Sequence, residues 1–144
     1  MSFSHDVSKW AVNTKHLRDD VVTLVFKRLG TLIVNRTPIG DRTLWSRPAP
    51  ADYRPGSLVN NWFAGIGEPG ALPRRGHNVN GADSLSQINA ISKAAPGKLA
   101  YIANPLPYAR RVEYGWSTQA PQGMVRISVA EFQRIVRKAV ADVA

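Results

Sequence analysis

The sequence predicts a single α+β domain with a long N-terminal helix, a small, mostly antiparallel sheet with a short helix, a C-terminal helix and long loops rich in proline and glycine. Apolar residues recur at helical spacing near both ends of the chain, and two strand-like segments lie between them. Helices and strands do not alternate regularly, which argues against a doubly wound sheet. At 144 residues and 44% hydrophobic, residues 1–144 can bury one core.

The first helix is predicted from residue 3 to about residue 34. Its apolar positions recur every three or four residues, with polar residues on the other face; they are Phe3, Val7, Trp10, Leu17, Val21, Leu24, Leu29, Leu32 and Ile33. Gly30 is expected to weaken or kink the last turns, and Pro38 ends the helix by Thr37 at the latest. We expect Trp10, on the apolar stripe, to lie in the core or in a subunit contact.

Residues 38–56 are dense in proline, glycine and aspartate, a composition that forms turns and extended chain. A loop of this length is uncommon in a small domain unless it has a function. Trp45 and Tyr53 lie within it without a periodic partner. They either fold back onto the core or contact a neighbouring chain. The loop is therefore predicted to be an interface insertion.

The middle of the chain predicts two strands and a short helix. Residues 57–67 carry apolar groups on both faces, as in a strand covered on both sides, and residues 98–104 alternate like a second strand. The turn-rich segment 68–83 follows the first of them. Ser84 and Gln87 have the spacing of a capping box, which begins a helix that ends at Pro96 and Gly97.

The segment PLPYARRVEYGW, residues 105–116, is expected to contain two short helical turns from Tyr108 to Tyr114, because Pro107 suits the first helical position. Gly115 permits a sharp exit. Residues 124–128 read as a short strand or an extended lead-in. Ser128 and Glu131 form a second capping-box pattern ahead of the apolar stripe of the C-terminal helix.

The chain is strongly basic, with a formal net charge of +9. Such a charge favours phosphate-rich or acidic partners, but arginines are also preferred in ion pairs across subunit contacts. The basic residues are scattered rather than grouped, which favours the second explanation. There are no cysteines, so disulfides and thiolate metal sites are excluded. No apolar run is long enough to span a bilayer and no signal peptide is recognisable, so we expect no membrane contact.

The titratable residues do not indicate an enzyme. The three histidines, His5, His16 and His77, have no metal-ligand spacing, and no glycine-rich phosphate loop occurs. A nuclease site could be drawn from Glu113, Arg110 and His77 only if they lay within hydrogen-bond reach. Glu113 more readily accepts backbone N–H groups or pairs with an arginine. The prediction is a protein without catalytic residues, metal or cofactor.

Three motifs occur in an informative order: TPIGD at 37–41, GSLVNNW at 56–62 and YARRVEYGW at 108–116. Together they resemble the minor tail-component family of long-tailed bacteriophages, the tail-completion or neck proteins that join the tail to the head. The resemblance spans residues 3 to 140. The chain departs from the family in the insertion DRTLWSRPAPADYRP and in the segment after Gly123. The motif residues taken as structural are Pro38, Gly40, Gly56, Leu58, Trp62 and Gly115.

The resemblance implies a structural virion protein, made in the host cytoplasm, that completes the tail as a ring around the DNA channel. The resemblance implies that copies of this chain form a closed, six-fold homo-oligomer. The ring would lie between a connector or stopper protein and a tail terminator or tube protein, and would contact the DNA in the channel without reading its sequence. The residues predicted at its interfaces are Trp45, Tyr53, Tyr108, Arg110, Arg111, Glu113, Tyr114 and Trp116. The alternative is a stand-alone basic nucleic-acid-binding domain, which needs basic residues interleaved with exposed aromatic residues on one surface.

Overall fold

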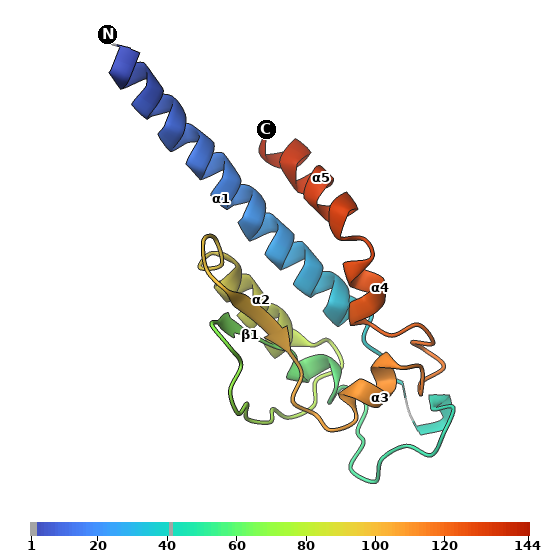
Figure 1. The fold of residues 1–144 in the computed structure, drawn as a ribbon. Helices are drawn as coiled ribbons and strands as arrows, with labels where there is room; N and C mark the ends of the chain where they lie inside the picture. The colour runs from blue at the N-terminus through green and yellow to red at the C-terminus, as the bar shows by residue number, and fades with distance from the viewer. Residues whose placement is uncertain (1–2, 41) are drawn as a thin grey trace.

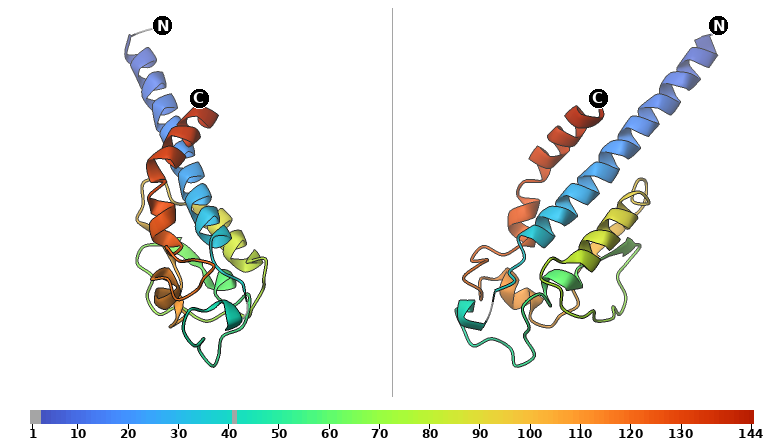
Figure 2. Two further views of the ribbon diagram at one scale, coloured as in Figure 1. Left: turned by 90° about the vertical axis from the view of Figure 1, so that its right-hand side faces the viewer. Right: turned by 180° about the vertical axis from the view of Figure 1, so that it is seen from behind.

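The computed structural model describes residues 3–40 and 42–144, and its order of elements confirms the α+β fold (Figure 1). Helix α1 (Phe3–Asn35) lies between helix α5 (Phe132–Val143) on one side and helix α2 (Ala82–Ser92) with the sheet on the other (Figure 2). Helix α4 (Val125–Val129) lies beside the C-terminal end of α1, and the short helix α3 (Ala109–Glu113) and several loops gather beyond that end.

Helix α1 runs through Gly30 without interruption, so the expected weakening or kink there is wrong. A Cβ atom at Gly30 would lie 2.6 Å from Cγ2 of the buried Ile88, which shows that glycine permits the close approach of α2. The packing of α2 offsets the helix-propensity cost of a glycine, about 1 kcal/mol. The helix ends at Asn35, before Pro38 as predicted.

The sheet consists of strand β1 (Phe63–Ile66) paired antiparallel with strand β2 (Ala100–Ala103), with Phe63 opposite Ala103. The second predicted strand is confirmed with narrower bounds, whereas the first half of the strand predicted at 57–67 is wrong. That part of the chain forms turns and the 3₁₀ helix η2 (Val59–Asn61). Its asparagines explain the difference, because they hydrogen-bond to backbone atoms of another segment instead of joining a ladder.

Asn60 and Asn61 of η2 are buried and bind the connection that leads to α2. Asn60 Nδ2 donates to the Gly76 carbonyl at 2.9 Å. Asn61 Oδ1 accepts from the backbone N–H of Arg75 at 2.7 Å. Leu58 is buried beside them. These side chains therefore hold η2 against the loop 68–81 rather than against a strand.

Neither predicted capping box forms. Helix α2 begins at Ala82, so Ser84 lies within it; its hydroxyl accepts from Trp62 N–H at 3.0 Å and donates to the Val59 carbonyl at 2.7 Å. The Gln87 side-chain oxygen accepts from the Ala64 N–H at 3.1 Å. Ser84 and Gln87 therefore fasten α2 to the segment 59–64, because backbone groups there need partners that a two-stranded sheet does not supply.

At the C-terminal end, residues 125–129 form helix α4, so the strand or lead-in predicted at 124–128 is wrong. The Ser128 hydroxyl donates to the Met124 carbonyl at 2.6 Å inside this helix. Glu131 instead accepts from Arg36 at 2.8 Å and Arg134 at 2.6 Å. The pair with Arg36 joins the start of α5 to the end of α1.

The hydrophobic core lies at the C-terminal half of α1, where the helices, the sheet and the loops meet. The Trp62 indole N–H donates to Thr37 Oγ1 at 2.9 Å, and the Thr37 hydroxyl donates to the Ile33 carbonyl at 2.7 Å. The structural motif residue Trp62 therefore joins the centre of the chain to the end of the long helix. The largest fully buried apolar side chains are those of Leu58, Ile88, Met124, Val34 and Val112.

Candidate assembly surface

Three of the aromatic residues predicted at interfaces lie inside the chain. Trp45, Tyr53 and Tyr108 are buried and pack edge to face, with ring centroids 5.1 to 5.9 Å apart. Burial raises the pKa of the Tyr108 phenol. The loop 38–56 therefore folds back onto the core, and the interface prediction is wrong for these three side chains, because packing against one another and the core removes them from the surface.

The loop is held against the segment that follows α3 by backbone hydrogen bonds. Trp45 and Ser117 form an antiparallel bridge, with Ser46 N–H donating to the Trp116 carbonyl and Thr118 N–H to the Leu44 carbonyl, each at 2.7 Å. The Tyr53 hydroxyl also donates to the Gly40 carbonyl. The two loops that carry the family-like motifs therefore form one unit.

Glu113 binds the start of α4. Its Oε2 atom accepts from the N–H groups of Met124 at 2.8 Å and Val125 at 2.9 Å, and its Oε1 atom accepts from that of Arg126 at 2.9 Å. The Arg126 side chain adds a 3.1 Å ion pair. The sequence predicted that Glu113 accepts hydrogen bonds from backbone N–H groups or pairs with an arginine, and both interactions are confirmed. This carboxylate caps a helix of its own chain, which gives Glu113 a structural role.

The pKa of Glu113 reflects two opposing influences. Desolvation raises it, but the N–H groups of Arg126, Val125 and Met124 and the Arg126 side chain together hold it below the ordinary value of 4.5. Because the folded-state pKa is depressed, the stabilisation is present above the unfolded-state pKa and is lost as pH falls through the folded-state pKa.

We expect Glu113→Gln to lower the free energy of unfolding at pH 7 by about 2 kcal/mol, since it replaces hydrogen bonds to a charged acceptor. The loss should shrink as the pH falls below 4.5, where the carboxylate of the unfolded chain takes up a proton, and should vanish below the depressed pKa of the folded state. Urea unfolding of both proteins between pH 3 and pH 7 measures this difference. A difference that stays constant over the range would contradict the cap. Glu68→Gln, which removes an exposed carboxylate, is the control.

Four of the remaining predicted interface residues form a surface patch with two arginines that were not predicted, here called the basic-aromatic patch; Trp116 is half-buried against the core and the other members are exposed. Its members are Arg47, Arg110, Arg111, Tyr114, Trp116 and Arg126. The Arg47 and Arg111 guanidinium carbons lie 4.7 and 5.0 Å from the Trp116 ring centroid. Arg126 lies 4.7 Å and Arg110 5.9 Å from that of Tyr114. In the described part of the chain, Arg47, Arg110 and Arg111 form no ion pair. The patch therefore presents uncompensated positive charge beside aromatic rings.

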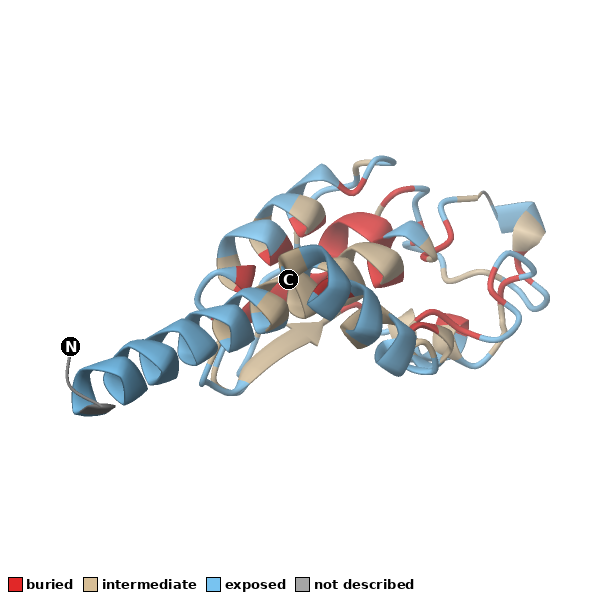
Figure 3. Cartoon of the chain, turned by 90° about the horizontal axis from the view of Figure 1, so that it is seen from above, coloured by how far each residue is buried: buried red, intermediate tan, exposed pale blue. Residues whose placement is uncertain are grey.

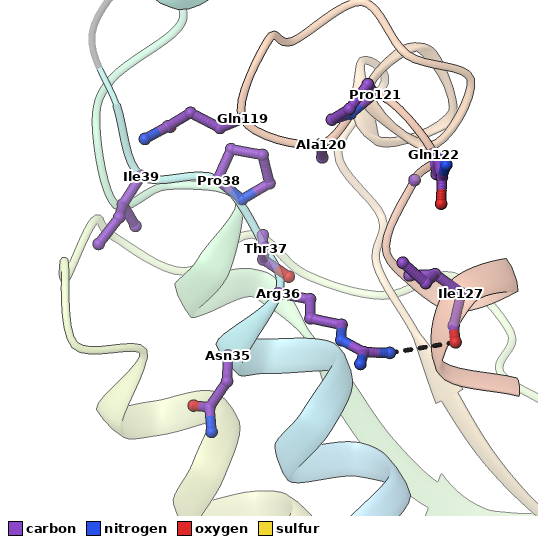
Figure 4. Close-up of a pocket in the computed structure, with 11 residues that line it drawn as sticks. Asn35, Arg36, Thr37, Pro38, Ile39, Gln119, Ala120, Pro121, Gln122 and Ile127 are labelled. Atoms are coloured by element: carbon purple, nitrogen blue, oxygen red, sulfur yellow. Dashed lines mark hydrogen bonds between the residues drawn. The ribbon is translucent and has the colours of Figure 1, made fainter. Parts of the chain in front are cut away.

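The TPIG turn borders a hollow of about 380 Å³, shown in Figure 4. The chain around Pro38 forms one wall and residues 119–123 form the other. Gly40 N–H donates to the Gln119 side chain at 2.8 Å, and Arg36 donates to the Ile127 carbonyl at 3.0 Å across the hollow. Asp41, the last residue of the TPIGD motif, lies outside the described residues. The turn thus joins the end of α1 to the loop before α4.

The other motif residues shape backbone turns. Gly56 has a φ of 87° and lies so close to the loop 68–81 that a Cβ atom would be 2.8 Å from the Asn78 carbonyl carbon. Gly115 has a φ of 89°, as its predicted sharp exit requires. These residues therefore maintain the fold, which matches their assignment as structural.

The N-terminal half of α1 projects away from the rest of the molecule (Figures 1 and 3). Every residue from Ser4 to Arg18 is exposed, including Val7, Trp10 and Leu17 at 46%, 68% and 51%. The expectation that Trp10 lies in the core is wrong, because α5 is too short to reach it. The subunit-contact alternative stays a prediction. The helical spacing of the apolar residues revealed this stripe in the sequence, but Trp10 was not among the predicted interface residues.

The residues of the hypothetical nuclease have other surroundings. His77 lines a cleft with Asp52, Arg54 and Arg74, while the Glu113 carboxylate is occupied by the N–H groups at the start of α4. Among residues 3–40 and 42–144, no group of three or more histidine, aspartate or glutamate side chains is placed to hold a metal ion. No helix within the same residues is both long and apolar enough to cross a membrane.

Comparisons of the chain with protein-family models, with curated proteins and with solved structures found no match.

Proposed function

We propose that this chain is a structural subunit of the neck of a long-tailed bacteriophage, made in the host cytoplasm and built into the virion, where it completes the tail and joins it to the DNA-filled head. The projecting half of α1 carries this proposal. It exposes an apolar stripe that no other part of the described chain covers. The proposed role is non-enzymatic and requires no cofactor.

The physical reason is that an exposed stripe of large apolar side chains marks a protein contact. Helices in proteins gain most of their stability from packing an amphipathic face, and this half of α1 has no packing of its own. A subunit that becomes complete only in an assembly explains such a surface. The ordered motifs TPIGD, GSLVNNW and YARRVEYGW supply the resemblance to neck proteins, and a six-fold ring between the connector or stopper and the tail terminator or tube is the arrangement we infer.

The test is electron microscopy of lysates of a phage that encodes this chain and from which its gene has been deleted. We expect DNA-filled heads and separate tails, and normal particles after the gene is supplied from a plasmid. Joined, infectious particles without the gene would refute the neck assignment.

The basic-aromatic patch favours a second candidate function, non-specific nucleic-acid binding. Arginines stacked beside aromatic rings on an open surface combine the two elements that sequence-independent binding uses. In a ring the same patch would contact DNA in the channel. In the stand-alone alternative it would be the main functional site.

We expect Arg110→Ala/Arg111→Ala to weaken double-stranded DNA binding by the purified protein and to reduce the slope of log K against log salt by about 2, because two phosphate contacts are lost. Fluorescence anisotropy at several salt concentrations measures both quantities. Lys93→Ala/Lys98→Ala removes the same charge from exposed positions near α2 and should change the slope little. Equal effects of the two pairs would show that net charge alone is responsible, and absence of wild-type binding would set this candidate aside.

A further inference from the structure

We propose that the apolar stripe of α1 in one copy docks into a groove between α1 and α5 of the next copy. This inference rests on the proposed ring and specifies its subunit contact. The stripe consists of Val7, Trp10, Thr14 and Leu17 on the projecting half of α1. The groove is lined by Val21, Val22, Val25 and Leu29 of α1 and by Phe132 and Val136 of α5.

The groove is an open, wholly apolar surface of the folded part of the molecule. It has a volume of about 320 Å³ and is lined only by valine, leucine and phenylalanine side chains. Phe132 is 43% exposed, and Val140, about two turns further along α5, is also exposed. Helix α5 therefore packs with only part of its apolar face against α1 and leaves the rest open.

The stripe matches the groove in character and in length. Thr14 and its three apolar neighbours recur at spacings of three and four residues, so they lie on one face of the helix. From Val7 to Leu17 the stripe extends about 15 Å, and the groove residues on α1, from Val21 to Leu29, extend about 12 Å. A helix laid along the groove would thus cover it with one ridge of side chains.

The charges beside the two surfaces are complementary. Asp6 and Asp20 flank the stripe, as helical neighbours of Trp10 and Leu17. Arg137 flanks the groove as a neighbour of Val140. Arg18 and Asp19, both neighbours of Val22, lie at the end of the groove nearest the stripe, and Arg18 is also a neighbour of Thr14. Arg18 has only an exposed 3.6 Å pair with the adjacent Asp19, and such a pair contributes little. Acidic side chains beside the stripe can therefore meet basic ones beside the groove.

The two surfaces cannot meet within one chain, because both belong to the same straight helix. Thr14 precedes Val21, the first groove residue, by about 10 Å along α1. A contact between the stripe of one copy and the groove of another leaves one stripe and one groove free, so further copies add until the assembly closes. A symmetric stripe-to-stripe dimer would leave every groove uncovered. The heterologous contact covers both surfaces.

Site-directed cross-linking tests the contact directly, since the natural chain has no cysteine. Thr14→Cys places a thiol in the stripe while keeping Trp10, and Val140→Cys places one beside the groove. The double variant is treated with a short bismaleimide, both as purified full-length protein and in phage particles assembled from it. We expect a ladder of covalent oligomers longer than dimers, with each single variant remaining mostly monomeric.

Two further variants make the result specific. Adding Trp10→Ser to the double variant should remove the ladder, and pairing Val140→Cys with Lys9→Cys, on another face of α1, should give little product. Dimers from Thr14→Cys alone would overturn the proposal in favour of symmetric pairing, and absence of the ladder from both purified protein and particles would also overturn it. A ladder from purified protein together with normal gene-deleted particles would support the contact while refuting the neck function.

Discussion

Trp45→Ala is expected to lower the free energy of unfolding by about 4 kcal/mol, the usual effect of removing a buried large aromatic side chain. Trp45 is only 9% exposed and packs edge to face on both Tyr53 and Tyr108. Each such aromatic pair contributes about 1 kcal/mol beyond the burial of its area. The substitution leaves a cavity where the loop 38–56 meets the core, so the loop loses its main attachment.

Urea denaturation of the purified chain measures this change, and Trp10→Ala is the matched control. Both variants lose the same side chain, but Trp10 is 68% exposed, so its replacement should change the free energy of unfolding by less than about 1 kcal/mol. A Trp45→Ala protein as stable as the wild type would show that the loop does not pack in this way.

These two tryptophans also separate two reasons for failed assembly. Trp45→Ala should reduce assembly because the subunit itself is less stable, and a lower temperature should restore it in part. Trp10→Ser should leave the stability of the subunit almost unchanged and reduce assembly through the lost contact. Particle yield and unfolding free energy measured on the same variants distinguish the two causes.

Ser84→Ala is expected to lower the free energy of unfolding by about 3 kcal/mol, because two buried backbone groups lose their partner. The Ser84 hydroxyl is fully buried, accepts from the Trp62 N–H at 3.0 Å and donates to the Val59 carbonyl at 2.7 Å. Alanine is a better helix former than serine, which offsets only about 0.5 kcal/mol of this loss.

Ser86→Ala provides the control for this substitution. Ser86 lies two residues further along α2 and is exposed, so its replacement keeps the gain in helix propensity without the lost hydrogen bonds. Its stability should equal or slightly exceed that of the wild type in the same thermal or urea measurement. If Ser84→Ala behaved like Ser86→Ala, the two backbone groups would have other partners, and α2 would not depend on this hydroxyl for its attachment.

The sequence alone determined the features that depend on neighbouring residues. The 3.6-residue spacing of apolar side chains predicted the first helix, and Pro38 predicted its end. The short helix predicted at Tyr108 to Tyr114 is confirmed with narrower bounds, and Gly115 correctly predicted its sharp exit. Pro107 does not occupy the first helical position, because the helix begins at Ala109 with Tyr108 as its N-cap. The alternative functions of Glu113, acceptance from backbone N–H groups or an arginine pair, were also recognisable, since a carboxylate among turns needs such partners.

Only the tertiary structure decided the features that depend on residues distant in sequence. Ser84 has the spacing of a helix cap, yet its hydroxyl binds Trp62 and Val59, more than twenty residues earlier. Residues 124–128 have the composition of a strand, but Glu113, eleven to thirteen residues before, caps them as a helix. The periodicity of α1 identifies an apolar face without showing what covers it. Helix α5 covers only its second half, and that difference in length leaves Trp10 exposed.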